Sequence, residues 1–266
     1  MIARFISTLF ALFIGSVVHA DALRLAVTTS FHNSGLSDVL LPEVSVDTGL
    51  EVQLLVVGTG QAIRLGQAGD VDAILVHARA AEDAFVTEGY GTHRREIMAN
   101  DFVFVGPVGD PAAAQTATTA SQALERIALT ESPFVSRGDD SGTHTRERAL
   151  WESSSAAPDP NWYRELGAGM GATLNTAAAM GAYTLTDRAS WLNFGNRRGM
   201  SIVFEGDPAL LNQYAYLPVS AERHPHVNQN GAIILETWLT SERGQTLIGN
   251  YRINGEILFT PNAKAP

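Results

Sequence analysis

Short apolar segments alternate with amphipathic ones along almost the whole chain, and this alternation restricts the fold more than any other feature. The apolar runs are about five residues long, as buried strands are, and the segments between them have helical periodicity. Strands are expected at residues 23–27, 52–57, 71–76 and 102–105, and helices at residues 36–46, 61–67 and 79–87. Strands that alternate with helices form βαβ units around a mostly parallel sheet. The sequence therefore predicts an α/β fold with helices flanking its sheets.

A change in composition near the middle of the chain indicates two lobes. Residues 106–120 are rich in Pro, Gly, Ala and Thr, and a second series of strands and helices begins at residues 133–136. We expect residues 21–106 and 213–266 to form the first lobe and residues 107–212 to form the second. A chain that leaves one lobe and later returns to it crosses twice between them, and two such crossings form a natural hinge.

Residues 1–20 have the pattern of a secretory signal. Arg4 precedes an apolar run over residues 5–18, and the segment ends in the small residue Ala20. The run is shorter than the roughly 20 apolar residues that span a bilayer, so we expect cleavage after Ala20 rather than a membrane anchor. The chain has no Cys, and we therefore expect no lipid anchor on an N-terminal Cys of the mature protein.

Composition and charge argue against several classes of protein. Hydrophobic residues make up 45% of the chain and charged residues 17%, which is typical of a globular protein. The net charge of -10 argues against binding to nucleic acid or to anionic membranes. This charge also offers an anionic ligand no long-range attraction. An anion would have to be held by donors within its own site.

Three junctions between a strand and the following helix carry small hydroxylated residues and glycine, at residues 28–30, 58–60 and 136–143. Ligands bind beyond the carboxyl ends of parallel strands, and a helix start offers unpaired N–H groups and a partial positive charge. Residues of these types also cap helices and form turns, which is the more frequent role for either of the first two junctions alone. The third junction favours an anion site, because Arg137 adds charge-assisted donors beside a helix start.

Other chemistry has weaker support in the sequence. The segment 58–60 begins like a dinucleotide-binding fingerprint, but Ile63 occupies the position of the last glycine, and the chain has no P-loop motif. The His residues form no metal-binding motif. Ser141 and His144 are the one obvious pair of nucleophile and base, and no G-x-S-x-G elbow surrounds Ser141. We expect a binding protein without metal or cofactor rather than an enzyme, and a hydrolase that uses Ser141 is the weakest alternative.

A series of short motifs runs in order through nearly the whole mature chain. They lie at residues 28–30 (TTS), 56–62 (VVGTGQA), 69–72 (GDVD), 75–77 (LVH), 88–91 (EGYG), 100–103 (NDFV), 136–144 (SRGDDSGTH), 169–175 (GMGATLN) and 182–188 (AYTLTDR). This set resembles the tungstate-binding proteins of bacterial ABC importers. Those proteins belong to the larger group of two-lobed periplasmic binding proteins of type II.

The resemblance implies a cleft between two lobes, in which hydroxyl groups, backbone amides and an arginine hold an oxyanion. Carried over position by position, the expected ligands are Thr29, Ser30, Thr59, Arg137, Ser141, Gly142 and Thr143, with Thr184 and Thr186 as weaker candidates. In this family a third Thr often precedes the first pair, and Val27 stands there in this chain. The resemblance also implies a periplasmic monomer that closes around tungstate and delivers it to the permease of an ABC importer in the inner membrane.

The choice of anion stays open at this stage. Tungstate and molybdate differ only in sub-ångström fit, and phosphate-binding proteins have a comparable cluster of Arg, Asp, Ser, Gly and Thr. A carboxylate of Asp139 or Asp140 that faced the ligand would accept a proton from hydrogenphosphate and would repel the fully deprotonated tungstate. Alternatively, both carboxylates pair with Arg137 or cap the following helix. A buried dianion requires many donors, and we expect roughly six to nine hydrogen bonds and a Kd below about 1 μM.

Overall fold

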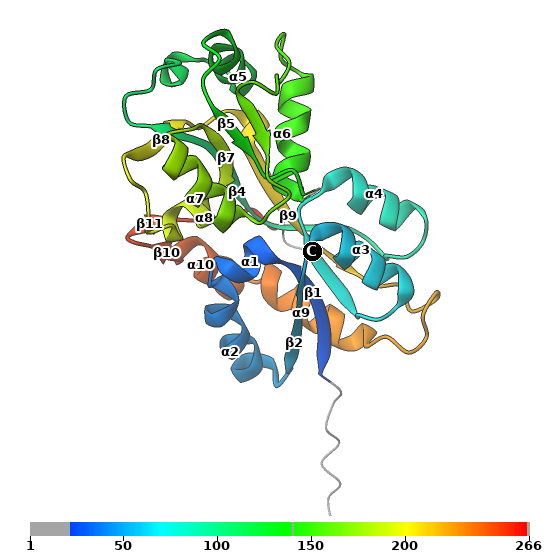
Figure 1. The fold of residues 1–266 in the computed structure, drawn as a ribbon. Helices are drawn as coiled ribbons and strands as arrows, with labels where there is room; N and C mark the ends of the chain where they lie inside the picture. Colours follow the sequence, from blue (N-terminus) through cyan, green and yellow to red (C-terminus); the bar gives the residue numbers. More distant parts are fainter. Residues whose placement is uncertain (1–21, 140, 265–266) are drawn as a thin grey trace, which may run out of the picture.

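The computed structural model describes residues 22–139 and 141–264, which form two lobes joined by extended strands (Figure 1). The predicted signal at residues 1–20 lies outside the described residues, as does Asp140. Within the described part of the chain, no helix is both long enough and apolar enough to cross a membrane.

The first lobe is built on a parallel ladder in which β1 lies between β2 and β3. Its elements are β1 (Leu23–Thr28), α1 (Thr29–Asn33), α2 (Leu36–Thr48), β2 (Val52–Val57), α3 (Thr59–Ala68), β3 (Ala73–Val76) and α4 (Arg79–Thr87). On one face of the sheet, Ile63 of α3 and Phe85 of α4 pack in a cluster with Ile74 of β3. On the other face, Leu40 of α2 packs in a cluster with Leu25 of β1. Because both faces are covered, these strands read as near-continuous apolar runs.

Two antiparallel strands, β4 (Arg95–Pro107) and β9 (Leu211–Pro218), connect the lobes. The first part of β4 pairs with β9 in the first lobe, and its second part pairs with β7 and β8 in the second lobe. The strand expected at residues 102–105 is therefore only part of a longer one. Asn100 and Asp101 interrupt the apolar pattern there, because the buried Asn100 side chain accepts a hydrogen bond from Asn212 and Asp101 pairs with Arg188.

The second lobe has its own core behind β4. Its elements are a 3-10 turn (Ala114–Thr116), α5 (Ala120–Leu129), β5 (Phe134–Ser136), α6 (Gly142–Glu152), β6 (Tyr163–Glu165), α7 (Met170–Met180), β7 (Thr184–Asp187), α8 (Arg188–Asn193), β8 (Met200–Phe204) and a second 3-10 turn (Pro208–Leu210). Leu124 of α5 and Trp151 of α6 pack in one cluster with Phe104 of β4. Leu174 of α7 and Trp191 of α8 belong to the cluster that continues into the first lobe. A single apolar core thus extends across the junction between the lobes on this side.

After β9 the chain remains mainly with the first lobe. It forms α9 (Gln229–Thr240), α10 (Glu242–Asn250), β10 (Arg252–Ile253), β11 (Glu256–Ile257) and β12 (Thr260–Pro261). Leu235 and Ile248 pack in the same cluster as α2, and β12 adds to the edge of β4. The turn between β10 and β11 also reaches the second lobe, where Asn254 Nδ2 donates to the carbonyl oxygen of Leu192 at 2.9 Å.

The predicted α/β fold with two lobes is confirmed. The main sheet is mixed rather than uniform, with the order β12-β4-β9-β3-β1-β2 and with β7 and β8 paired to β4. It is parallel through β3, β1 and β2, where helices make the crossovers, and antiparallel where β4 and β9 run between the lobes. Strands that enter and leave a lobe in opposite directions pair in this antiparallel way.

Candidate functional site

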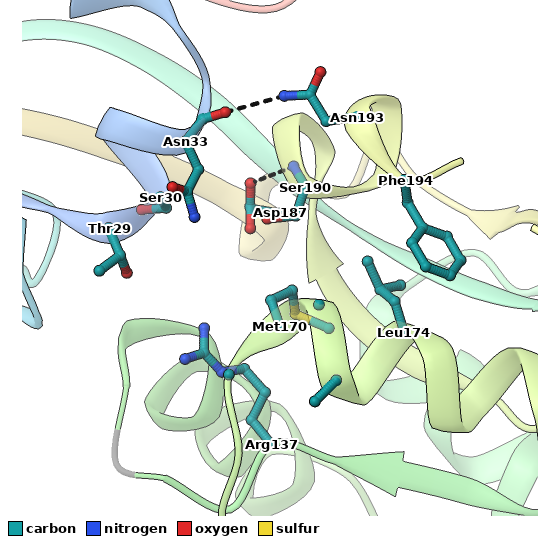
Figure 2. Close-up of a pocket in the computed structure, with 13 residues that line it drawn as sticks. Thr29, Ser30, Asn33, Arg137, Met170, Leu174, Asp187, Ser190, Asn193 and Phe194 are labelled. Atoms are coloured by element: carbon teal, nitrogen blue, oxygen red, sulfur yellow. Dashed lines mark hydrogen bonds between the residues drawn. The ribbon is translucent and has the colours of Figure 1, made fainter. Parts of the chain in front are cut away.

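A pocket of about 500 Å³ lies between the lobes and is lined by both of them (Figure 2). The first lobe contributes α1, and the second contributes the turn after β5, the start of α7 and α8. The lining residues are Thr29, Ser30, Asn33, Arg137, Gly169, Met170, Gly171, Ala172, Leu174, Asp187, Ser190, Asn193 and Phe194. This lining combines hydroxyl groups and amides with one guanidinium and one carboxylate.

The α1 side of the pocket is formed by Thr29 and Ser30, directly after β1 ends. Thr28 is the N-cap of α1 and accepts the backbone N–H of Phe31 at 3.3 Å, so the chain turns sharply at the end of the strand. Thr29 is exposed, and Ser30 is half-buried. The structure therefore brings both predicted hydroxyl donors into the pocket.

Arg137 lies opposite α1, and its guanidinium extends toward Thr29 (Figure 2). Its side chain is only 13% exposed, and its NH2 group donates to Asp139 Oδ2 at 2.5 Å. Partial burial raises the pKa of Asp139, but hydrogen bonds from Ser141 and Arg137 outweigh burial and lower that pKa below its usual value. Asp139 is therefore the counter-ion of Arg137. This is the pairing that the sequence analysis gave as the alternative to an Asp139 carboxylate facing the ligand. The Nε of Arg137 is buried and has no hydrogen-bond partner among the described residues, while the side chain as a whole lines the pocket.

The start of α7 forms the wall of the pocket beside Arg137. Residues 169–172 line the pocket, and no side chain caps the first turn of the helix. Gly169 and Gly171 have open space where a Cβ would stand, so a ligand can approach this backbone closely. The first N–H groups of a helix have no partner within the helix and carry part of the positive end of its dipole. They supply further donors for an anion.

Asp187 is the one carboxylate in the pocket lining. It was not among the ligand residues that the sequence predicted. It is 2% exposed, stands at the end of β7, and accepts the backbone N–H of Ser190 at 2.9 Å as the N-cap of α8. Burial raises the pKa of Asp187, although hydrogen bonds from Ser190 and the charge of Arg137 oppose this effect. The motif at residues 182–188 contained this residue, but a capping role explains an Asp at that position equally well.

The start of α6 lies at the same junction between the lobes but does not line the pocket. Ser141 is the N-cap of α6 and accepts a backbone N–H of its first turn at 3.3 Å, and Thr143 is buried. A Cβ on Gly142 would lie 2.7 Å from Cε1 of His77, and His77 Nε2 is 3.1 Å from Ser30 Oγ. Only one side chain thus separates this predicted segment from the hydroxyl group of Ser30.

The remaining predicted residues lie away from the pocket lining. Thr59 begins α3 and is half-buried. Thr184 and Thr186 are fully buried in β7, where they stand opposite β4 and their hydroxyl groups contact carbonyl oxygens of β7 itself. Packing explains threonines that are buried in a strand in this way, so this arrangement gives no support to their predicted ligand role. Val27, the departure from the family pattern, is also fully buried in the core.

Several residues of the pocket carried no recognisable signal in the sequence. Asn33, Ser190 and Asn193 come from the short helices α1 and α8, which face each other only after folding, and Asn193 Nδ2 donates to the carbonyl oxygen of Asn33 at 3.0 Å. Gly169 and Gly171 belong to the motif at residues 169–175, which contributed to the family resemblance but was not expected to bind the ligand. Among the residues that the structure describes, no group of three or more His, Cys, Asp or Glu side chains is suited to hold a metal ion.

The fold and the pocket together define a two-lobed solute-binding protein with an interlobe site suited to a small anion. Comparison with known proteins agrees with this class. The family profile described as "PBP superfamily domain" matches residues 17–243. The tungstate-binding protein TupA of Peptoclostridium acidaminophilum is 44% identical over 246 residues, which cover 91% of this chain and 86% of that protein.

Two solved structures are also similar. The tungstate-binding protein TupA from Desulfovibrio alaskensis G20 has a TM-score of 0.85 at 43% identity, covering 92% of this chain and 100% of that one. The tungstate ABC transporter structure from Geobacter sulfurreducens has a TM-score of 0.79 at 44% identity, covering 87% of this chain and 99% of that one. The chain therefore belongs to the PBP superfamily and, within it, to the family that these TupA proteins represent.

Proposed function

We propose that this protein captures tungstate in the pocket between its lobes and delivers it to the permease of an ABC importer. The observation that carries the proposal is a single pocket in which Arg137, the hydroxyl groups of α1 and the uncapped start of α7 are gathered. These groups donate hydrogen bonds, and most are neutral, as a binding site for a fully deprotonated oxyanion requires. Relatives named for tungstate binding, at 44% identity over most of the chain, support the choice of anion.

The proposed ligands fall into two groups. Thr29, Ser30 and Arg137 bind first, together with backbone amides at the start of α7. Of the other predicted residues, Thr59 and the segment 141–143 become ligands only when the lobes approach each other further. The moving bodies are residues 21–106 with 213–266 and residues 107–212, and they rotate about the strands that connect them.

Phosphate is the second candidate, because Asp187 lines the pocket. A carboxylate there accepts a proton from hydrogenphosphate, whereas it repels tungstate or molybdate unless it is protonated. The raised pKa of Asp187 reduces this objection to tungstate, since a carboxyl group whose pKa is raised takes up a proton more readily beside a bound dianion. The relatives favour tungstate over phosphate.

The wider function follows the same family. The protein is secreted after cleavage at Ala20, acts in the periplasm as a monomer, and presents its closed form to the permease. It acts as a binding protein rather than as an enzyme. The position of Ser141 supports this reading over a hydrolase, since its hydroxyl group caps α6.

Isothermal titration of the purified protein with tungstate, molybdate, sulfate and phosphate in parallel tests the proposal. We expect tight one-to-one binding of tungstate, with a Kd below about 1 μM, and no heat with phosphate. Binding of phosphate alone would replace tungstate by the second candidate and make Asp187 its proton acceptor. No binding of any of the four anions would refute both.

A further inference from the structure

A buried polar network supports Ser30 from behind. Its Oγ lies 3.0 Å from Thr28 Oγ1, 3.1 Å from His77 Nε2 and 3.2 Å from the Tyr214 hydroxyl oxygen. Thr28 and Tyr214 are buried. Of these four residues only Ser30 lines the pocket, so the network acts on a ligand through that one hydroxyl group.

His77 is the member of the network that contacts both lobes. It follows β3 directly, and its ring packs on Tyr214 with 4.8 Å between ring centroids. On its other side is Gly142 of the second lobe, where a side chain would come within 2.7 Å of Cε1. Glycine is required at residue 142 for this close approach. The ring is thus held between the turn that carries Ser30 and the start of α6.

The hydrogens of the network can be assigned by counting donors and acceptors. A hydroxyl group donates one hydrogen bond and accepts two, and a neutral imidazole has one N–H and one bare nitrogen. His77 Nδ1 is buried and, among the described residues, has no hydrogen-bond partner of normal geometry. A proton on Nδ1 would therefore be a buried N–H without a well-placed acceptor, which is rarer and more costly than a bare nitrogen. The proton belongs on Nε2, which then donates to Ser30 Oγ.

This assignment restricts the direction of the Ser30 hydrogen. With His77 donating to Ser30 Oγ, the hydrogen of Ser30 does not point at His77. It points at the hydroxyl group of Thr28 or of Tyr214, or into the pocket. A charged ligand oxygen is a stronger acceptor than a hydroxyl group, so a bound anion takes this hydrogen.

We propose that His77 is a positioning and specificity-determining residue, whose Nε2–H tautomer leaves the hydrogen of Ser30 free for the ligand and so favours ligand oxygens that carry no proton. The inference rests on the proposed function for the identity of the ligand, but the tautomer itself is a property of the empty protein. A protonated oxygen of hydrogenphosphate that faced Ser30 would lie against the Ser30 hydrogen instead of against an acceptor.

The surroundings keep the ring neutral, as the proposal requires. Burial lowers the pKa of His77 to about 4, weaker interactions with its own backbone and with the nearby Asn212 amide oppose this shift, and the positive charges of Arg146 and Arg137 add to it. The ring therefore carries one proton throughout the neutral pH range. What varies is which nitrogen holds that proton, and the network fixes it.

Nitrogen NMR of the ligand-free protein tests the tautomer directly. Long-range ¹H–¹⁵N correlation separates Nε2–H from Nδ1–H imidazoles, and the signal of His77 is assigned by its loss in the variant His77→Gln. We expect the Nε2–H form. The Nδ1–H form would overturn the proposal, whatever the protein binds.

Titration of variants tests the consequence for the ligand. His77→Met, which removes the donor, should weaken tungstate binding about tenfold and reduce the preference for tungstate over phosphate. His77→Gln, which restores an N–H near the position of Nε2, should recover most of that loss. His93→Gln is the matched control, because His93 pairs with Glu236 away from the pocket.

Unchanged affinity and preference in His77→Met, with tight tungstate binding by the wild type, would refute the role of His77 and leave the proposed function standing. Absence of tungstate binding by the wild type would refute the function instead, and the NMR result would still decide the tautomer.

Discussion

The two turns that face the pocket are built alike in sequence and differently in chemistry. The turn at Ser30 and the turn at Arg137 each follow a buried strand and precede a helix. The Ser30 hydroxyl group lies within 3.2 Å of three neutral partners, two of them buried. Arg137 is held by one carboxylate, Asp139, and its Nε has no partner within the described protein.

This difference indicates that the two turns contribute differently to ligand binding. Neutral hydrogen bonds fix the direction of a donor without adding charge, so the turn at Ser30 is preorganised for one kind of oxygen. The turn at Arg137 places a charged donor in the pocket lining and holds a counter-ion beside it, so it supplies most of the attraction. We expect the second turn to govern affinity and the first to govern selectivity.

Arg137→Ala should have the largest effect on binding. The loss of a buried charged donor costs about 3 kcal/mol or more, which corresponds to a weakening of tungstate binding of roughly 100-fold or more. The melting temperature should change little, because the side chain lies in a pocket and not in an apolar core. Arg243→Ala is the control, since Arg243 forms ion pairs with Glu43 and Asp47 on the outer surface of α2. Normal affinity of Arg137→Ala in calorimetry would show that the site has been wrongly assigned.

Glu147 on α6, which lies behind the turn at Arg137, should control stability rather than binding. It is buried and accepts a hydrogen bond from the Tyr163 hydroxyl group at 2.7 Å. Burial raises the pKa of Glu147 from 4.5 to about 7, and the charge of Glu165 acts in the same direction, while hydrogen bonds oppose it. A pKa raised in the folded state means that the fold binds the proton more tightly than the unfolded chain does. Stability is then complete below about pH 4.5 and is lost as the pH rises to about 7.

The loss of folding stability caused by this carboxyl group is on the order of 3 kcal/mol above pH 7. Glu147→Gln should remove it, so chemical denaturation at pH 8 should give a larger free energy of unfolding than the wild type has. At pH 4.5 the two proteins should agree. A variant that is less stable than the wild type at pH 8 would contradict this explanation.

Ser30→Ala should weaken tungstate binding less than the loss of Arg137 does. A hydrogen bond to a charged oxygen contributes about 1.5–3 kcal/mol, so a weakening of about tenfold or somewhat more is expected. Thr59→Ala gives a direct comparison, because Thr59 begins α3 outside the pocket lining. If Thr59→Ala weakened binding more than Ser30→Ala, the closed site would be centred on α3 instead of α1.

Asp187→Asn should have the smallest effect, and its sign is the informative part. Asn retains the cap of α8 and removes a carboxylate from the lining, so tungstate should bind a few-fold more tightly at pH 8. In the wild type, tungstate affinity should rise as the pH falls toward the raised pKa of Asp187, and the variant should lose this dependence. A fall in affinity for phosphate, without any tungstate binding, is the result that the phosphate candidate predicts.

The sequence predicted best those features that depend on local periodicity. The helix expected at residues 79–87 has the bounds of α4, and the strand expected at residues 52–57 has those of β2. By contrast, the polar residues Asn100 and Asp101 hid the first part of β4, because their partners lie elsewhere in the chain. Helix α5 was not predicted, since it begins within the linker-like composition of residues 106–120.

The same division holds for the pocket. Arg137 could be predicted because its residue type, next to a helix start, already indicates anion chemistry. Asp187, His77 and Tyr214 could not, because each has an ordinary structural explanation in its own segment. Their roles depend on β3, β7 and β9 meeting at the junction between the lobes, which is a property of the tertiary fold.

The most direct test is a crystal structure of the protein grown with tungstate, with data collected at the tungsten absorption edge. The proposal predicts one strong anomalous peak in the pocket, within hydrogen-bonding distance of Arg137, Ser30 and the first amides of α7. A pocket without a peak, in a protein that binds tungstate in solution, would contradict the site. A peak bound elsewhere on the surface would contradict it equally.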